Sequence, residues 1–303
     1  MWKELLKEKG FLVSDGAWGT ELAKGGLEPG AAPELLNVER PEVVLAVASS
    51  YVEAGSEIIL TNTFGANRLK LAHSGLADRT KELNARGAEI SLKAAKGRAL
   101  VFASVGPTGE FLEPLGSLAE PQMVECFAEQ IAALAEAGAD GIVIESMSAV
   151  DEGAAALKAA RGVCKLPVVI SMTFEKGMTG YATMMGTRPE VAARSFDAAD
   201  IVGANCGSGI ANMVAVARLM RSSTRKPLWI KSNAGLPELV GGKTVFHESP
   251  DEMAARLGDL VKAGANIIGG CCGTTPDHIR AIVRARTALA RSARATLSKQ
   301  LEL

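Results

Sequence analysis

The chain has 303 residues, with 33 Lys and Arg against 34 Asp and Glu, so its formal net charge is −1. This balance gives no electrostatic basis for binding a nucleic acid, and a hydrophobic content of 48% is too high for a disordered chain. The first residues are charged and no segment approaches about 18 consecutive apolar residues, so we expect a cytoplasmic protein without signal peptide or membrane span. The five cysteines are irregularly spaced, which favours metal ligands or nucleophiles over a disulfide framework.

One short phrase recurs three times along the chain, at residues 53–59, 136–142 and 262–268. Each copy joins the end of a helix, marked by glycine, to a short apolar run that predicts a buried strand. Three copies of the same joint indicate that strands and helices alternate.

The alternation extends over the whole chain. Strands are predicted at 11–15, 57–62, 100–105, 141–145, 167–173, 200–205, 228–233 and 266–270. Helices are predicted near 41–54, 77–97, 121–137, 151–163, 188–199, 209–222, 250–263 and 276–291. This order predicts the α/β class and a single (β/α)8 TIM barrel over residues 1–303, with 286–303 as a helical C-terminal extension. A doubly wound open sheet is the weaker alternative, because no Gly-rich phosphate loop follows the first strand.

In such a barrel the chemistry lies where the strands end and the following loops begin. The polar and thiol-bearing residues at the predicted strand ends are Asp15, Asn62, Thr63, Glu145, Ser146, Thr173, Asn205, Cys206, Ser232, Asn233, Cys271 and Cys272. A purely structural barrel does not need such a set, so these ends predict a functional site.

The three cysteines at strand ends give the most specific signal. Cys206 ends the sixth strand, and Cys271 and Cys272 end the eighth between glycines that allow the backbone to turn. These strands lie two apart, about 10 Å, and alternate strands share side-chain layers inside a barrel. Three thiolates without a fourth ligand in the pattern predict a catalytic zinc site with one open position. Packing in tight gaps is the alternative, and it is the better interpretation for the helical Cys126 and Cys164.

Five motifs along the chain resemble those of the zinc-dependent homocysteine S-methyltransferase family. They lie at 15–21 (DGAWGTE), 61–67 (TNTFGAN), 105–109 (VGPTG), 203–207 (GANCG) and 269–274 (GGCCGT). The resemblance covers about residues 11–285 in the family's order, and in particular it is to the homocysteine-binding module of cobalamin-dependent methionine synthase. It implies methyl transfer to homocysteine to give methionine, with Cys206, Cys271 and Cys272 as the zinc ligands.

A site built from three cysteines favours sulfur alkylation over hydrolysis. Zinc lowers the pKa of a substrate thiol, and the thiolate is the nucleophile. Three protein thiolates leave the ion with a net negative charge, so the bound sulfur keeps its ability to attack a methyl group.

Further residues are predicted to bind the charged groups of homocysteine. Asp15 and Glu145 are suited to the ammonium, and the resemblance implies acids at these two positions. The backbone N–H groups of the turn through Gly16, Ala17 and Thr20 are suited to the carboxylate. Glu145 follows a buried apolar run, where it needs a cationic partner, and we expect the substrate to supply it.

Two of these residue types have a simpler interpretation. Asp15 is also a common turn or cap residue. Asn233 is predicted to hydrogen-bond a zinc-bound sulfur or the substrate, and an Asn that holds its own turn is nearly as good an interpretation.

The sequence argues against a quaternary ammonium methyl donor. The betaine branch of the family carries tyrosines where this chain has Gly65 and Ser146, and the whole chain has two Tyr. An aromatic cage is therefore not expected. Because the chain ends soon after the barrel, we expect the donor to be a methylcorrinoid (cobalamin) on a separate protein, or a sulfonium. The segment 175–187 is expected to be a lid or rim packing, and the arginines after residue 279 a solvated face or a basic stripe.

Two other functions stay open at this point. One is a corrinoid-dependent methyltransferase that acts on another thiol or on a methylated compound. The other is a noncatalytic zinc-binding barrel that serves as a subunit of an assembly.

Overall fold

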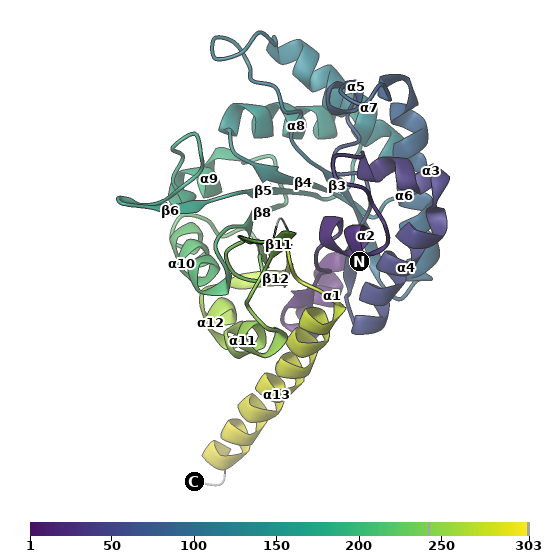
Figure 1. The fold of residues 1–303 in the computed structure, drawn as a ribbon. Helices are drawn as coiled ribbons and strands as arrows, with labels where there is room; N and C mark the ends of the chain where they lie inside the picture. Colours follow the sequence, from purple (N-terminus) through teal and green to yellow (C-terminus); the bar gives the residue numbers. More distant parts are fainter. Residues whose placement is uncertain (242, 302–303) are drawn as a thin grey trace.

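Eight parallel strands form the central sheet of the computed structural model. The structure describes residues 1–241 and 243–301, and it describes the side chains of all of these except 243 and 290–301. Their order is β1-β12-β9-β8-β5-β4-β3-β2. A parallel bridge between Ser14, which follows β1, and Ile58, the first residue of β2, joins the two outer strands. The sheet therefore closes into a barrel with helices around it, and the predicted (β/α)8 fold is confirmed (Figure 1).

The predicted strands are all present, with shifts of a few residues at their ends. They are β1 (Leu12–Val13), β2 (Ile58–Leu60), β3 (Leu100–Val105), β4 (Gly141–Met147), β5 (Val168–Met172), β8 (Ile201–Cys206), β9 (Leu228–Ser232) and β12 (Ala265–Gly270). The first strand is the shortest because the backbone leaves the sheet at Asp15, where the strand-end chemistry begins.

The predicted helices are also present, with one correction. They are α4 (Pro41–Ala54), α6 (Thr80–Ala95), α7 (Glu120–Glu136), α8 (Val150–Val163), α9 (Pro189–Ser195), α10 (Ile210–Arg221), α11 (Pro250–Ala255), α12 (Leu257–Lys262) and α13 (Pro276–Leu301). The single helix expected over 250–263 is wrong, because the backbone at Arg256 (φ −91°, ψ −1°) interrupts it and leaves two short helices.

Several short elements were not predicted. They are α1 (Trp2–Lys9), α2 (Gly19–Lys24), η1 (Pro33–Leu35), α3 (Leu36–Glu39), α5 (Arg68–Ala72), η2 (Ala77–Arg79), and the hairpins β6 (Glu175–Gly177) with β7 (Gly180–Ala182) and β10 (Glu238–Val240) with β11 (Lys243–Val245). Because 77–79 form η2, the helix expected from residue 77 begins at Thr80.

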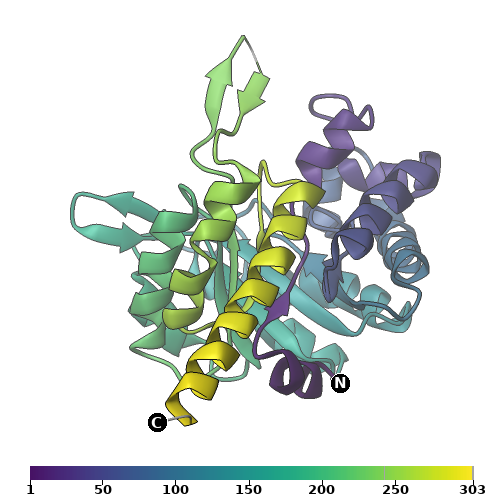
Figure 2. The same cartoon turned by 90° about the horizontal axis from the view of Figure 1, so that it is seen from below.

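The C-terminal helix is longer than the barrel requires. Helix α13 continues without a break from Pro276 to Leu301, and its last turns project away from the barrel (Figures 1 and 2). Residues 302–303 of the expected extension, and the side chains of Arg291 and Arg294 in the expected basic stripe, lie outside the described part of the structure.

Two apolar layers hold the barrel together. Alternate strand residues that face the helices, such as Val101 and Ile142, join the large core between sheet and helices. The intervening strand residues form a second cluster inside the barrel, and Trp2 of α1 belongs to it. Within this inner cluster Phe102 and Trp229 stack with ring centroids 6.2 Å apart. The large rings fill the barrel below the strand ends.

Glycines make room for these rings. A Cβ on Gly203 would lie 2.2 Å from the backbone oxygen of Trp229, and one on Gly141 would lie 2.8 Å from the Phe102 ring. Small residues on neighbouring strands therefore compensate for two large side chains in one layer.

Gly203→Ala should lower the free energy of unfolding by about 1–3 kcal/mol, because the added methyl forces the β9 backbone to move. The matched control is Gly162→Ala on helix α8, where a Cβ meets no atom within 4 Å. The control should be neutral or stabilising by about 0.5–1 kcal/mol. Equal midpoints for both variants in urea unfolding would contradict this account of the inner layer.

Candidate active site

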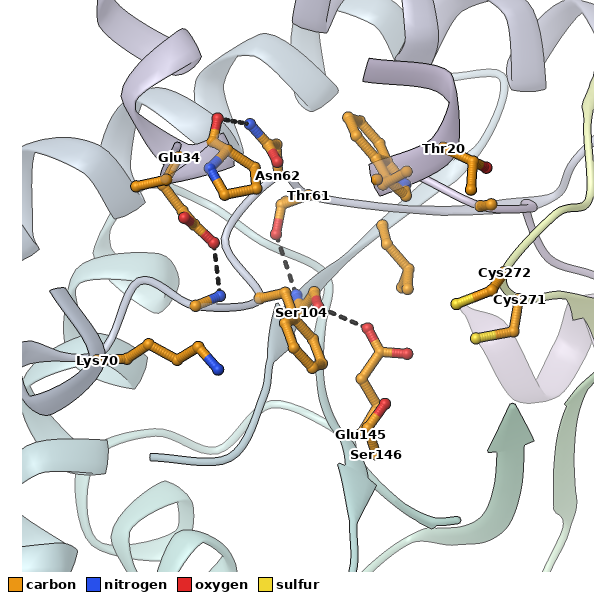
Figure 3. A pocket seen from close by; sticks show the side chains of 18 of the residues that line it. Thr20, Glu34, Thr61, Asn62, Lys70, Ser104, Glu145, Ser146, Cys271 and Cys272 are labelled. Carbon is orange, nitrogen blue, oxygen red and sulfur yellow. Dashed lines mark hydrogen bonds between the residues drawn. The ribbon is translucent and has the colours of Figure 1, made fainter. Parts of the chain in front are cut away.

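The strand ends surround a cavity of about 740 Å³. Its wall includes the turn after β1, the loop after β2, Ser104, Glu145, Ser146, Lys231 and the three cysteines at the ends of β8 and β12. Figure 3 shows Cys271 and Cys272 on one side of this space and Glu34 and Lys70 on the opposite side. The predicted location of the functional site at the carboxyl ends of the strands agrees with this cavity.

The three predicted cysteines lie together. The sulfur atoms of Cys206, Cys271 and Cys272 all lie within 4.8 Å of one another, and the Cys206 and Cys271 sulfurs are 3.1 Å apart. The turn that brings both β12 thiols to the cavity depends on Gly270, where a Cβ would lie 2.2 Å from Thr274 Oγ1. Cys206 adopts a left-handed backbone conformation (φ 65°), which turns its side chain toward the other two.

The proximity of the thiols changes their acidity. Hydrogen bonds from the Cys206 and Cys272 thiols, helped by the charge of Lys231, hold the pKa of Cys271 well below its ordinary value. The pKa of Cys206 is raised well above its ordinary value, first by its hydrogen bonds to Cys271 and Cys272 and then by burial. For Cys272 the Cys206 thiol lowers the pKa, but the hydrogen bond and charge of Cys271 raise it to about 12. One of the three thiols therefore loses its proton readily, whereas ionisation of the other two needs a compensating cation.

This donor set fits a zinc ion. Soft thiolates that converge within metal-binding distance suit Zn²⁺, and the cation would offset the repulsion that opposes full ionisation. Cys126 lies buried in α7 and Cys164 follows α8, so neither belongs to the group, as predicted.

Asn205 holds the sulfur group in place. Its Nδ2 donates to Ser146 Oγ (2.7 Å) and Cys206 Sγ (3.3 Å). Its Oδ1 accepts from the Ser146 amide (2.9 Å) and from Ser171 Oγ (2.7 Å). Ser146 itself has a positive φ of 63°, a strained conformation that these bonds stabilise. A fully buried amide therefore ties residues of β4 and β5 to β8, the strand that carries Cys206.

Asp15 is engaged by the protein. Its Oδ1 lies 2.5 Å from Lys231 Nζ, with side-chain exposures of 0% and 3%. Its Oδ2 accepts from the Leu60 amide (2.7 Å) and Trp18 Nε1 (2.8 Å). Asp15 is not among the residues that line the cavity, whereas Lys231 is. Asp15 is thus held in a buried ion pair, and its assignment to the substrate ammonium stays a prediction.

Glu145 faces the cavity with a single close partner. Its Oε1 accepts from Ser104 Oγ at 2.5 Å. Burial raises the pKa of Glu145 to about 7, although the nearby charge of Lys231 lowers it. Lys231 is thus a protein cation near this acid, which the sequence analysis missed, although the ion pair of Lys231 is with Asp15.

The turn after β1 also lines the cavity. The amide of Ala17 donates to Thr274 Oγ1 (3.1 Å), so this one N–H is already used. Thr20 Oγ1 is buried without a hydrogen-bond partner, and Gly16 packs against Tyr51, where a Cβ would lie 2.8 Å from the ring. That this turn receives the substrate carboxylate stays a prediction, with the N–H of Ala17 already engaged by the protein.

Asn233 supports a turn. Its Nδ2 donates to the carbonyl oxygen of Gly207 (2.8 Å), its amide donates to the Cys206 carbonyl (3.2 Å), and its Oδ1 is buried without a partner. It does not line the cavity. These contacts agree with the alternative in which Asn233 holds a turn. Through them Asn233 contacts the backbone of Cys206 and Gly207.

The side of the cavity that lies opposite the cysteines was not predicted. Glu34 is buried there and accepts from the Gly65 amide (2.6 Å), and burial raises its pKa. A Cβ on Gly65 would lie 2.9 Å from the Glu34 carboxylate, so a large side chain at 65 does not fit. Among the lining residues only Trp18 and Phe64 carry phenyl or indole rings, in agreement with the expected lack of an aromatic cage.

The segment 175–187 does not line the cavity. It forms the hairpin β6–β7, which extends outward from the barrel (Figure 1), with Met178 fully exposed and Tyr181 Oη donating to Asn212 Oδ1 (2.8 Å). Across the described residues, no helix has the length and apolar character needed to span a membrane.

Glu145→Gln should change how stability depends on pH. A raised pKa means that the folded protein binds this proton more tightly, so the stabilisation is complete below about pH 4.5 and disappears as the pH rises through about 7. In metal-free protein, we compare the free energy of unfolding of the wild type with that of Glu145→Gln. The difference, wild type minus variant, should fall by about 3 kcal/mol between about pH 4.5 and pH 7. Urea unfolding across the range tests this, with the exposed Glu125→Gln as the control; a constant difference between wild type and Glu145→Gln would show that Glu145 is not the titrating group.

Comparisons with known proteins identify the family of this chain. A profile of the homocysteine S-methyltransferase family matches residues 12–286. The methionine synthases of Mycobacterium leprae and Mycobacterium tuberculosis are each 32% identical over 296 residues, which is 90% of this chain and 24% of those proteins. The chain therefore spans about a quarter of the length of these relatives.

The fold is also found in a solved structure. The metallated form of the homocysteine methyltransferase MmuM from Escherichia coli superimposes with a TM-score of 0.78 at 24% identity, over 92% of this chain and 97% of that one. From the profile match over nearly its whole length, this chain belongs to the homocysteine S-methyltransferase family.

Proposed function

We propose that the protein is a zinc-dependent thiol methyltransferase that converts homocysteine to methionine. The observation that carries the proposal is the group of three cysteine sulfurs within 4.8 Å at the wall of a cavity that also holds a buried acid. Membership of the homocysteine S-methyltransferase family supports the same reaction. The five free cysteines suit a reducing compartment, and we place the protein in the cytoplasm.

Cys206, Cys271 and Cys272 would hold the zinc ion. When bound, zinc supplies a lowered pKa for the substrate thiol and a fixed position for its sulfur. The Asn205 amide, by donating to Cys206 Sγ at 3.3 Å, orients this ligand and draws electron density from it.

The rest of homocysteine has complementary groups on the cavity wall. Glu145 is the acid that faces the cavity, and it would accept the substrate ammonium. The carboxylate would lie against the turn 16–20, where Thr20 Oγ1 lacks a partner and helix α2 begins at Gly19 without a side-chain cap. These contacts would set the distance of the substrate sulfur from the cysteines.

The transfer itself is a displacement at carbon. The substrate sulfur donates an electron pair to the methyl carbon, and the donor leaves with the pair of the broken bond. The chain's residues need to orient the reactants and to keep water away from them. The buried layer of Phe102 and Trp229 beneath the strand ends would limit access of water from below.

A methylcorrinoid on a partner protein and a small sulfonium are the donors that we propose. The absence of bulky rings at Gly65 and Ser146, both on the cavity wall, argues against betaine. The similarity to methionine synthases supports the corrinoid.

Cys206→Ser and Cys271→Ser should each lose zinc and lower kcat/KM for homocysteine by more than about 100-fold, because each removes one of three ligands. Metal analysis of the purified variants and a methionine assay measure the two effects. Cys164→Ser, which lies outside the group, is the matched control and should keep both properties. Full zinc content and full activity in both ligand variants would refute the proposed site.

The donor is identified by one set of assays. Purified protein with homocysteine is given methylcobalamin, S-methylmethionine or betaine in turn, and methionine is measured. We expect turnover with at least one of the first two, and none with betaine because the cavity lacks an aromatic cage. Turnover with betaine alone would overturn this part of the proposal.

A further inference from the structure

A second acid lies across the cavity from the cysteines, and the proposed binding of homocysteine does not use it. Glu34 belongs to η1, is 3% exposed and lines the cavity. Lys70 of α5 lines the same side, and Figure 3 shows both residues opposite Cys271 and Cys272. We propose that Glu34 and Lys70 form a second amino-acid subsite, which binds the ammonium and the carboxylate of a sulfonium donor such as S-methylmethionine. The inference rests on the proposed function and chooses between its two donors.

The segment that carries Glu34 is fixed to the end of β2. Asn62 Nδ2 donates to the carbonyl oxygen of Pro33 (2.8 Å) and to Asn37 Oδ1 (2.9 Å). Asn37 Nδ2 donates in return to the carbonyl oxygen of Asn62 (2.8 Å). Gly65 leaves space for the carboxylate, because a Cβ at this position would lie 2.9 Å from Glu34 Oε1. The acid is therefore in place before a ligand arrives, which lowers the entropic cost of binding.

In the part of the chain that the structure describes, no cation contacts the Glu34 carboxylate. Its hydrogen bonds come from backbone N–H groups, that of Gly65 at 2.6 Å and its own. The charge of Lys70 acts on this acid, but the two side chains form no ion pair. Burial raises the pKa of Glu34 above its ordinary value. An ammonium in the cavity would supply the cation that the buried carboxylate lacks.

Lys70 lies at the mouth of the same side of the cavity, where it is exposed. The Asn67 side chain caps α5 by accepting from the Lys70 amide (2.9 Å), so the backbone that carries the lysine is held in place. Among the described residues Lys70 has no ion-pair partner, and Ser74, which also lines the cavity, is four positions further along the chain. An α-amino acid carries an ammonium and a carboxylate on one carbon atom, and Glu34 with Lys70 offers one group for each.

The cavity wall carries two carboxylates among the described residues, Glu145 and Glu34, and they lie on different sides. A reaction between two amino acids brings two ammonium groups. Glu145 is proposed to receive that of homocysteine, so Glu34 is left for that of the donor. The corrin of a methylcorrinoid has no ammonium, and covering the cavity with it would remove water from Glu34 without supplying a cation. The arrangement therefore favours the amino-acid sulfonium.

The reaction with this donor balances without a further reactant. The thiol of homocysteine loses its proton to solvent, and the thiolate sulfur forms a bond to a methyl carbon of the sulfonium. The bond between that carbon and the donor sulfur breaks, and its electron pair stays on the donor sulfur. With S-methylmethionine the donor leaves as methionine, so each turnover gives two molecules of methionine.

Three donors that differ in one group test the assignment. S-Methylmethionine carries both charged groups, 4-(dimethylsulfonio)butyrate lacks the ammonium, and (3-aminopropyl)dimethylsulfonium lacks the carboxylate. The zinc-loaded full chain is given saturating, isotopically labelled homocysteine, and labelled methionine is measured. Each variant is described by the ratio of kcat/KM between two donors, because effects on zinc, acceptor and folding cancel in this ratio.

The variants are Glu34→Gln and Lys70→Met. Gln at position 34 keeps an oxygen that can accept from the Gly65 amide, and Lys70 is exposed, so we expect both variants to fold. Glu152→Gln is the matched control, since this buried acid accepts from Thr108 and does not line the cavity.

The wild type should use S-methylmethionine at least about tenfold better than the donor without the ammonium, because a hydrogen bond between charged groups is lost. Glu34→Gln should bring this ratio to within about threefold of unity and leave the KM of homocysteine unchanged. Lys70→Met should keep the preference for the ammonium and lower that for the carboxylate roughly threefold, since an exposed charge contributes less. Glu152→Gln should keep both ratios.

Full preference for the ammonium-bearing donor in Glu34→Gln would overturn the inference. A raised KM for homocysteine with an unchanged donor ratio would also overturn it, because Glu34 would then bind the acceptor. Turnover of the wild type with methylcobalamin but with none of the three sulfonium donors would overturn the inference and keep the proposed function. A chain that forms no methionine from any donor would refute the proposed function, and the inference with it.

Discussion

The structure depends on the closure of eight parallel strands, which gathers every strand end at one edge of a narrow barrel. Closure brings residues that are far apart in the chain within bonding distance: Asp15 and Lys231 are 216 positions apart and form a buried ion pair. The same constraint places Cys206 beside Cys271 across 65 positions. An apolar layer directly beneath this site and hydrogen bonds within it stabilise its charged and thiol groups.

The fold and the sulfur group could be predicted because their signals are local. Short apolar runs separated by glycines identify strands regardless of what they contact, and cysteines at the ends of two such runs must meet once the barrel is assumed. Helix breaks such as the one at Arg256 and short elements such as α2 leave no comparable periodic pattern, because a single turn is too short to show a helical period.

The electrostatic organisation could not be predicted in the same way. Lys231 lies within an apolar run, Leu228-Trp229-Ile230-Lys231, that identifies a strand without revealing which neighbour its ammonium meets. For this reason the ion pair of Asp15 with Lys231 was not predicted. Glu34 was missed for a related reason, since it comes from the short helix η1 between α2 and α3 and reaches the cavity only through the packing of that segment on Gly65. Which acid is free and which is paired depends on contacts between distant segments.

The stacked layer of Phe102 and Trp229 has one more consequence. It closes the barrel below the strand ends, so the cavity communicates with solvent from the side of the loops. The cysteines and Glu145 line one side of this space, and Glu34 and Lys70 lie across from them. In the proposed reaction, acceptor and donor would therefore approach the cysteines from the loop side of the barrel. The stacked aromatic layer would thus restrict both reactants to one face of the molecule, the face that carries the carboxyl ends of the strands.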